Sequence, residues 1–549
     1  MQADSRKIIS ENIVADRSKL KIICVFLHRI YFGRIPYERQ YRGKKRKAMN
    51  ITELQQSYAS HPNVEGVCRL LKDNSVRHLY CGGLYASAAS LFSSVLVQRA
   101  TCPLVFILGD MEEAGYFYHD LTQILGTEQV LFFPSSFRRA IKYGQKDAAN
   151  EILRTEVLSR LQKGEEGLCV VTYPDALAEK VVSRKELGDN TLKLHAGERV
   201  DMNFVTDVLR SYGFEYVDYV YEPGQYAVRG SIIDVFSFSS EYPFRIDFFG
   251  DEVESVRTFE VETQLSKEKK ESIVIVPDLS HSLEKKGSGG MVSFLDFLPS
   301  DSLLAMRDFL WLRERIQTVH DESLTPQAIA ARESEENGAI TLEGKLIDGG
   351  EFTLRALDFR RMEFGNKPTG TPDATVSFHT TVQPIFHKNF DMVAESFREY
   401  LSRHYTIYIC SDSLKQTDRI RAIFEDRGDN ISFTAVERTL HEGFADDTLR
   451  ICVFTDHQLF DRFHKYNLKS DKARSGKVAL SLKELNQFTP GDYVVHTDHG
   501  VGRFAGLVRI PNGDTTQEVM KIVYQNEDVV FVSIHSLHKV SKYKGKEGE

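Results

Sequence analysis

The stretch HLYCGGLYASAASLF, residues 78–92, has the outline of a phosphate-binding loop. An apolar strand runs into Gly82 and Gly83 and then into an alanine-rich helix. A working loop needs a lysine that reaches the phosphates and a hydroxyl that binds magnesium. Ser87 stands at the lysine position and Ala88 at the hydroxyl position. We therefore interpret the stretch as a degenerate phosphate loop, a strand-to-helix turn that is kept for packing and binds no ATP.

Strands and helices alternate on both sides of this turn. RHLYC (77–81), PLVFILGD (103–110) and GLCVVTYPDAL (167–177) have the composition of buried strands, and helical stretches such as NEILRTEVLSRLQKG (150–164) lie between them. This alternation is typical of βαβ units on a buried parallel sheet. The sequence contains no complete Gly-x4-Gly-Lys-Ser/Thr motif, either here or elsewhere.

The chain has 549 residues, enough for three to five domains, and we predict a multidomain α/β protein. The predicted parts are a basic extension (1–48), a degenerate nucleotide-binding α/β domain (49–190), an inserted small α+β domain (191–265), a return to the first domain (266–350), a linker (351–377), a second small α/β domain (378–466), a linker (467–482) and a small C-terminal β-barrel (483–549). Gly- and Pro-rich composition marks the first linker, and closely spaced short strands favour the barrel.

Charge and cysteine content indicate which partners and which cellular compartment fit this protein. The formal net charge is −8, and residues 1–48 alone carry +9, which leaves −17 for the rest. An acidic body is a poor general binder of nucleic-acid backbone. The seven cysteines show no Cys-x-x-Cys pair, which indicates a reducing, cytoplasmic compartment. No apolar run reaches the roughly 18 residues that span a bilayer.

The basic extension supports one alternative function. It interleaves aromatic residues with Lys and Arg, and these could contact bases and phosphates. The aromatic residues are Tyr31, Phe32, Tyr37 and Tyr41. A solvated tail is the simpler interpretation, and Met49 is a candidate for the true start of the protein.

Residues 221–260 hold the densest pattern of charged and aromatic residues. Arg229 and Arg245 fall on strands predicted to be neighbours, close to Phe248 and Phe249. Arginine beside aromatic residues on a sheet face is typical of a protein-binding surface. The alternative is ordinary surface charge neutralised by nearby carboxylates, namely Asp247, Asp251, Glu252 and Glu254.

Two other residue pairs invite a chemical role that the sequence does not support. Asp247 and Asp251 have no nucleophile or histidine beside them for acid–base catalysis. His496 and His499 have metal-like spacing, but no third ligand stands out, and strand alternation would direct them to different faces. We predict no catalytic residue and no metal site in this chain.

Three segments together resemble the bacterial transcription-repair coupling factors (Mfd). They are YGFEYVDYVYEPGQYAVRGSIIDVF with PFRIDFFGDEVESVRTFEVETQLS (212–236 and 243–266), HEGFADDTLRICVFTDHQLF (441–460) and GDYVVHTDHGVGRFAGL with the strands that follow it (491–507 onward). The first is also similar to a module of the UvrB excision-repair proteins, and the last resembles the CarD-related module that binds RNA polymerase. The resemblance runs from about Met49 to the last residue, with the segments in the family's order.

The resemblance implies a RecA-like, UvrB-like first domain that has lost its ATP site, which agrees with Ser87 and Ala88. It implies that the inserted domain binds UvrA, the damage-recognition ATPase, through Arg229, Arg245 and Phe249. These positions correspond to the arginine of AVRG and to the arginine and second phenylalanine of PFRIDFF.

The resemblance also implies that the C-terminal module, with a Tudor- or SH3-like barrel, pairs an exposed sheet edge with the β subunit of RNA polymerase. The expected docking strand consists of Leu507, Val508, Arg509 and Ile510. Ser533 departs from the family, whose members commonly carry proline there.

In the family, an ATP-dependent motor that translocates on DNA follows the polymerase module. We expect ATP, magnesium and most DNA contacts to belong to that motor, so this chain would be a non-catalytic adaptor without a cofactor and without a membrane role. An active UvrB-type helicase is the enzymatic alternative, but it would need the missing lysine and a damage-probing hairpin that the sequence does not show.

Overall fold

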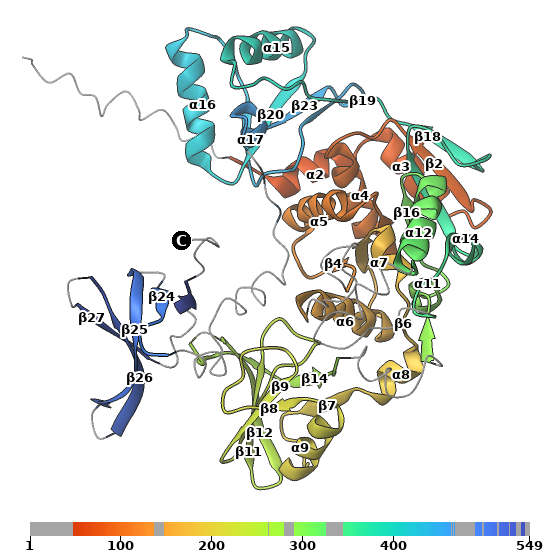
Figure 1. The fold of residues 1–549 in the computed structure, drawn as a ribbon. Helices are drawn as coiled ribbons and strands as arrows, with labels where there is room; N and C mark the ends of the chain where they lie inside the picture. The colour runs from red at the N-terminus through yellow and green to blue at the C-terminus, as the bar shows by residue number, and fades with distance from the viewer. Residues whose placement is uncertain are drawn as a thin grey trace, which may run out of the picture. The chain divides into compact units, whose positions relative to one another are not determined.

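The computed structural model describes residues 48–136, 148–261, 263–278, 290–325, 344–462, 464, 466, 489–496, 499–512, 515–525, 528–533 and 540–543 (Figure 1). Met1–Ala48 form a unit separate from Met49–Glu549. The aromatic residues of the basic extension and the predicted linker 467–482 lie outside the described residues. Within the described part, no helix has the length and apolar character needed to cross a membrane.

A seven-stranded parallel sheet forms the first domain, in the order β18-β2-β17-β16-β3-β5-β4. Its strands are β2 (His78–Gly82), β3 (Leu104–Ile107), β4 (Val130–Phe133), β5 (Cys169–Thr172), β16 (Leu303–Met306), β17 (Arg360–Gly365) and β18 (Ala374–Ser377). Every residue of β3, β4, β5 and β16 is buried, as expected of a parallel sheet covered on both faces.

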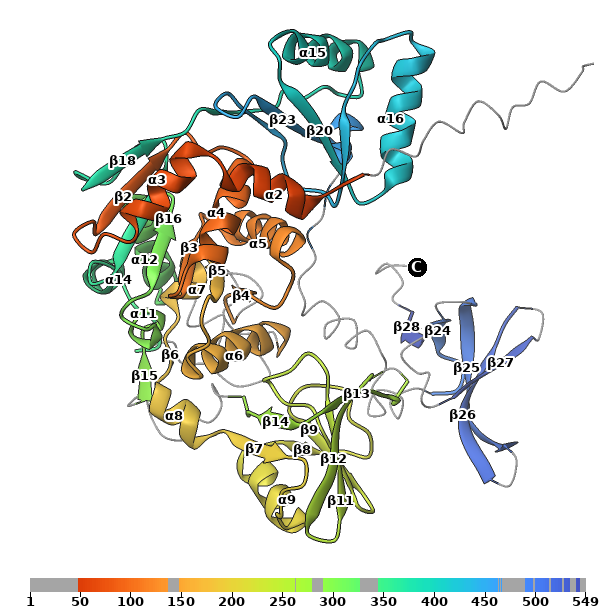
Figure 2. The same cartoon turned by 180° about the vertical axis from the view of Figure 1, so that it is seen from behind.

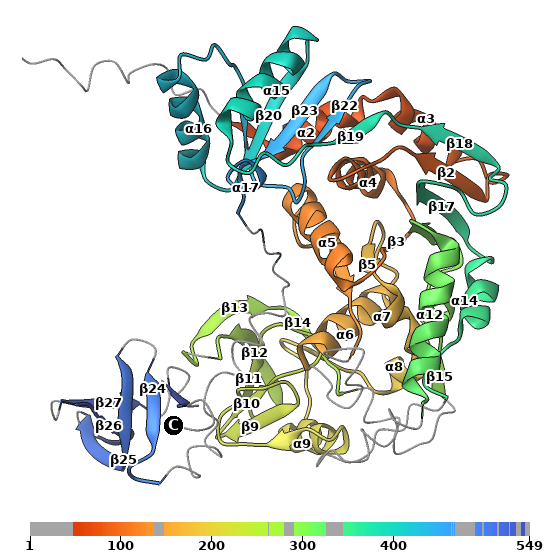
Figure 3. The ribbon, with the colours of Figure 1, turned by 45° about the horizontal axis from the view of Figure 1, so that its top comes forward.

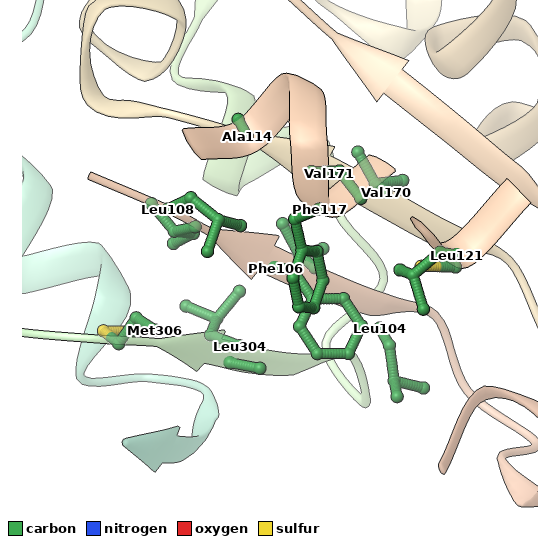
Figure 4. Close-up of a cluster of buried hydrophobic side chains, with 14 of the residues drawn as sticks. Leu104, Phe106, Leu108, Ala114, Phe117, Leu121, Val170, Val171, Leu304 and Met306 are labelled. Carbon is green, nitrogen blue, oxygen red and sulfur yellow. The ribbon is translucent and has the colours of Figure 1, made fainter. Parts of the chain in front are cut away.

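Helices cover both faces of this sheet, with α4 and α5 on one side and α12 and α14 on the other (Figure 2). The helices are α2 (Ile51–Ala59), α3 (Pro62–Leu70), α4 (Ala88–Arg99), α5 (Met111–Leu125), α6 (Ala148–Gln162), α7 (Pro174–Ala178), α8 (Arg184–Asp189), α11 (Phe294–Phe297), α12 (Phe309–Ser323) and α14 (Gly349–Ala356). In the core, Phe117 and Leu121 of α5 lie against Leu104 and Phe106 of β3 (Figure 4). A small pair, β6 (Val181–Val182) with β15 (Met291–Val292), lies outside the sheet.

The predicted linker 351–377 is not a linker. It contains most of α14 and the strands β17 and β18, and β17 lies between β2 and β16 inside the sheet. The Gly- and Pro-rich composition marks only the turn from β17 to β18, residues 366–373. The strand before that turn, β17, begins with two arginines and contains a glutamate, so its sequence lacks the continuous apolar run of its neighbours.

The inserted domain is a six-stranded sheet in the order β13-β12-β11-β10-β9-β8 with one helix, α9 (Met202–Ser211), packed on it. The strands are β8 (Glu215–Tyr216), β9 (Gln225–Arg229), β10 (Ile232–Val235), β11 (Phe244–Phe249), β12 (Glu252–Phe259) and β13 (Ser266–Lys270). A further pair joins β7 (Leu192–His195) to β14 (Ser272–Ile275). The domain therefore extends past residue 265, the predicted end.

The second α/β domain has a sheet in the order β1-β21-β20-β23-β22-β19, with α15 (Phe390–Ser402) and α16 (Leu414–Asp426) beside β20 (Figure 3). The strands are β1 (Met49–Asn50), β19 (Thr380–Val382), β20 (Thr406–Ser411), β21 (Thr434–Glu437), β22 (Phe444–Asp446) and β23 (Ile451–Thr455), followed by α17 (Asp456–Leu459). The edge strand β1 comes from the start of the first domain, and Asn50 also caps α2 by accepting from the Thr52 N–H at 3.0 Å.

The C-terminal module is an antiparallel sheet in the order β27-β26-β25-β24-β28. Its strands are β24 (Tyr493–His496), β25 (Gly500–Asn512), β26 (Thr515–Val523), β27 (Val529–Ser533) and β28 (Val540–Lys542). Closure into a barrel stays a prediction, because in the described residues the end strands β27 and β28 each pair with one neighbour.

Candidate protein-interaction sites

At the turn that the sequence predicts to be a degenerate phosphate loop, the chain makes its own contacts. The Ser87 hydroxyl, at the former lysine position, donates to Asp120 Oδ2 at 2.6 Å and accepts from the Glu442 N–H at 3.0 Å. The His441 N–H donates to Asp120 Oδ1 at 2.7 Å. Asp120 lies on α5 and residues 441–442 belong to the second α/β domain, so this network joins the two domains. Burial raises the pKa of the Asp120 carboxyl to about 7.

The two glycines of the loop, Gly82 and Gly83, also contact the segment that leads into the second α/β domain. Gly83 has a φ of +76°, and a Cβ there would lie 2.1 Å from the Phe378 carbonyl oxygen. The Thr380 hydroxyl donates to the Gly83 carbonyl at 2.7 Å, and the Phe378 N–H donates to the Gly82 carbonyl at 2.8 Å. The backbone that would cradle a phosphate thus contacts residues 378–380.

A cavity of about 430 Å³ remains beside the loop, and its charge is wrong for a nucleotide. Five carboxylates line it, namely Asp110, Glu112, Glu113, Asp120 and Glu442. The one lining cation, Arg307, is paired with Glu113 at 2.5 Å. Carboxylates at this density repel phosphate groups.

Arg229 and Arg245 are brought together by a residue that the sequence did not suggest, Asp234. Both arginines form ion pairs with the Asp234 carboxylate, Arg245 through Nε at 2.7 Å and through Nη2 at 2.9 Å. The predicted neighbour relation is wrong: β9 and β11 each pair with β10, which carries Asp234 and lies between them. Asp234 is 1% exposed, so the charge that holds the arginines lies beneath them.

Alternation along β11 separates the two phenylalanines. Phe248 shares the buried face with Ile246 and contacts the domain core, whereas Phe249 shares the outer face with Arg245 and is 79% exposed. A large apolar side chain left in solvent on the same face as fixed arginines is the composition of an interaction surface.

The expected docking strand, residues 507–510, lies within β25. On one side these residues pair with β26, from Leu507 opposite Met520 to Ile510 opposite Gln517. On the other side β24 and its preceding turn pair with β25 only as far as Phe504. Within the described strands, this edge of 507–510 is therefore unpaired and open to a further strand. Ser533 keeps its place in the ladder, opposite Val519.

The other candidate pairs gain no chemical role. The rings of His496 and His499 lie 4.7 Å apart, because His499 sits in the turn rather than on the strand, so the expectation of opposite faces is wrong. In the described ranges, no group of three His, Cys, Asp or Glu residues could hold a metal ion. Asp247 pairs with Arg257 and accepts from the Ser255 hydroxyl at 2.9 Å, so it has a structural partner.

Two family models match the chain. The UvrB interaction domain matches residues 192–281, and the CarD-like/TRCF RID domain matches residues 488–544. The transcription-repair-coupling factor of Bacillus subtilis (strain 168) is 22% identical over 545 residues, covering 85% of this chain. That of Staphylococcus aureus (strain USA300) is 23% identical over 530 residues, again with 85% of the chain covered. The chain spans about 45% of the length of these relatives.

Proposed function

We propose that this chain is a non-catalytic adaptor of transcription-coupled repair. It matches the models of the UvrB interaction domain and the CarD-like/TRCF RID domain in that order. It also resembles transcription-repair-coupling factors over 85% of its length. It would bind UvrA through the inserted domain and the β subunit of RNA polymerase through the C-terminal module. Both partners are cytoplasmic, and excision repair would thereby be recruited to stalled transcription complexes.

The observation that carries the proposal is the exposed Phe249 on the same sheet face as Arg229 and Arg245. Asp234 fixes the guanidinium groups, so little side-chain entropy is lost when they meet a partner. An aromatic anchor next to preorganised arginines is the usual core of a binding hot spot.

The edge of β25 at residues 507–510, which no described strand pairs, supports the polymerase contact. Leu507 is 39% exposed, and a partner strand could add main-chain hydrogen bonds along 507–510 without disturbing β26. Catalysis would lie outside this chain. The acidic cavity beside the predicted degenerate loop supports the proposal that ATP and magnesium act only in motor domains, of the kind expected in full-length relatives. Those motor domains would also make most of the DNA contacts.

The test is a binding titration of the chain with purified UvrA, comparing the wild type with Phe249→Ala. Phe249 is exposed and is not part of the core formed by the described residues of this domain, so its removal tests binding without unfolding the domain. We expect at least a tenfold weaker Kd, about 1.4 kcal/mol. Arg210→Ala is the control, because Arg210 is exposed on α9 and pairs only with Asp207. Wild-type protein that fails to bind UvrA, or a Phe249 variant that binds equally well, would contradict the proposal.

A further inference from the structure

A third arginine, Arg257 on β12, lies on the same outer face as Arg229 and Arg245. The strand register places Arg257 directly opposite Arg245, which in turn lies opposite Asp234 on β10. On the other side of β12, Lys269 of β13 lies opposite Arg257. One row across four strands therefore reads Asp234, Arg245, Arg257, Lys269.

The three arginines differ in how many donors they have left. A guanidinium carries five N–H groups. Arg245 uses its Nε and Nη2 on Asp234 and its Nη1 on the Gln264 carbonyl at 3.1 Å, and its side chain is 15% exposed. Its Cζ also lies 4.6 Å from the centre of the Phe259 ring. Most N–H donors of Arg245 are thus used in contacts within the domain.

Arg229 and Arg257 are less committed. Each donates through Nη2 to one aspartate, Arg229 to Asp234 and Arg257 to Asp247, and their side chains are 34% and 38% exposed. The Nε of Arg257 is buried, and no described residue accepts its hydrogen, so the donors that Arg257 can offer a partner are on Nη1 and Nη2. The Cζ of Arg229 also lies 4.9 Å from the centre of the Tyr219 ring. Arg229 and Arg257 therefore have more N–H groups left for a partner than Arg245 has.

The charge on this face favours an acidic partner. Its aspartates lie inward, with Asp234 1% and Asp247 13% exposed, whereas the arginines and Lys269 reach solvent. Glu252, opposite Phe249, and Glu254, in the bulge of β12, are exposed carboxylates beyond the row. Along the row itself the three cations lie outermost and the aspartate is buried, which gives a positive surface for carboxylates of a partner.

We propose that Arg257 is a further specificity-determining residue of this surface, and that it contacts an acidic segment of the partner together with Arg229 and Arg245. This inference rests on the proposed binding of UvrA by the inserted domain. Arg245 also positions the face, because it ties β11 to β10 and to the segment around Gln264.

The experiment measures UvrA binding and urea unfolding of the full chain for Arg257→Ala, Arg257→Lys, Arg245→Ala and the control Arg210→Ala. We expect Arg257→Ala to weaken binding at least tenfold and to lower the unfolding midpoint less than Arg245→Ala does, because the Ser255 hydroxyl still donates to Asp247. Arg257→Lys should recover only part of the affinity, since a lysine keeps the charge but cannot bind a carboxylate with two parallel hydrogen bonds. Arg245→Ala should lower the unfolding midpoint as well as the affinity.

The outcomes separate the two proposals. If Phe249→Ala weakens UvrA binding but Arg257→Ala does not, the inference about Arg257 is wrong and the proposed function stands. If Arg257→Ala lowers the unfolding midpoint as much as Arg245→Ala does, Arg257 is a structural residue and the inference is overturned. If the wild-type chain does not bind UvrA, the proposed function fails and the inference falls with it.

Discussion

Asp234 is a buried carboxylate whose two oxygens hold two arginines from flanking strands. Replacing it with alanine leaves both guanidinium groups without their common partner. Removing one member of a charge-assisted network costs about 1.5–3 kcal/mol per hydrogen bond, and the partly exposed arginines recover some of this by hydration. We predict that Asp234→Ala lowers the free energy of unfolding by about 2 kcal/mol, measured by urea denaturation.

The matched control for this prediction is Asp251→Ala. Asp251 is an exposed carboxylate in the turn between β11 and β12, and only its backbone carbonyl is used, by the Val200 N–H. Its substitution should change stability by less than about 0.5 kcal/mol. Equal effects of the two substitutions would mean that the arginines are held by other contacts.

Residue types and resemblance were enough to select Arg229, Arg245 and Phe249, but they did not reveal Asp234 or Arg257. The importance of Asp234 depends on which strand lies between β9 and β11, and the importance of Arg257 depends on its register opposite Arg245. Strand order and register are long-range properties, set by pairing rather than by local composition. A sequence pattern alone therefore locates the surface, but it does not show which charged residues on that surface pair with one another.

At the scale of elements, the strand-to-helix turn at Gly83 depends on both its own backbone conformation and its contact with the segment around Phe378. Gly83 has a positive φ, and a Cβ there would clash with the Phe378 carbonyl oxygen, which is backbone and cannot move aside cheaply. We predict that Gly83→Ala destabilises the protein by at least about 2 kcal/mol, because it adds left-handed strain to a backbone clash. Urea denaturation of the variant is the measurement.

Gly66 provides the control of opposite sign. It lies inside α3 with ordinary helical φ, and a Cβ there would meet no atom within 4 Å. Gly66→Ala should stabilise the protein by roughly 0.5–1 kcal/mol, since alanine loses less backbone entropy in a helix. A destabilising Gly66→Ala, or a neutral Gly83→Ala, would contradict this account of the two positions.

Elements with strong apolar periodicity were predictable, and elements formed from mixed sequence were not. The strands around 77–81, 103–110 and 167–177 are present as β2, β3 and β5. β17 was missed because RRMEFG alternates charge with apolar residues and precedes a Gly- and Pro-rich turn. β1 was missed because two residues at the start of α2 carry no strand signal, and only the presence of β21 defines them as an edge strand.

At the scale of the whole molecule, histidines fill the contact between the first domain and the second α/β domain. His119 comes from α5, and His441, His457 and His464 come from the second domain. The rings of His457 and His464 stack at 4.4 Å, those of His119 and His464 lie 5.1 Å apart, and Tyr116 of α5 stacks on His441 at 3.6 Å.

Charged groups surround this histidine cluster. Asp412 acts on His119, His457 and His464, Asp456 acts on His464, and Arg462 acts on His457. Glu442 Oε1 lies 3.9 Å from His441 Nε2. Burial nevertheless dominates, and it lowers the pKa of His119, His441 and His457 to about 4 and the pKa of His464 in the same direction.

These shifts make the contact between the domains depend on pH. A histidine whose pKa is lowered in the docked state gains a proton on separation once the pH falls below its ordinary pKa of 6.5, so docking weakens from pH 6.5 down to about 4. Asp120 has the opposite sign. Its carboxyl is protonated in the docked state below pH about 7 and loses that proton on separation above its ordinary pKa of 3.8, which favours docking as the pH falls.

The number of protons exchanged determines the steepness of this pH dependence, and hydrogen exchange at the His441 and Glu442 amides, which donate across the contact, can measure it. His119, His441, His457 and His464 favour proton uptake on separation, whereas Asp120 and Asp456 favour proton release. The opening equilibrium, corrected for intrinsic exchange, should rise as the pH falls from 6.5 toward 4, because the histidines outnumber the carboxyls. Asp120→Asn removes an opposing group and should make this rise steeper, whereas His119→Gln should make it shallower. If neither substitution changes the slope, the histidine cluster and Asp120 do not control how these two domains hold together.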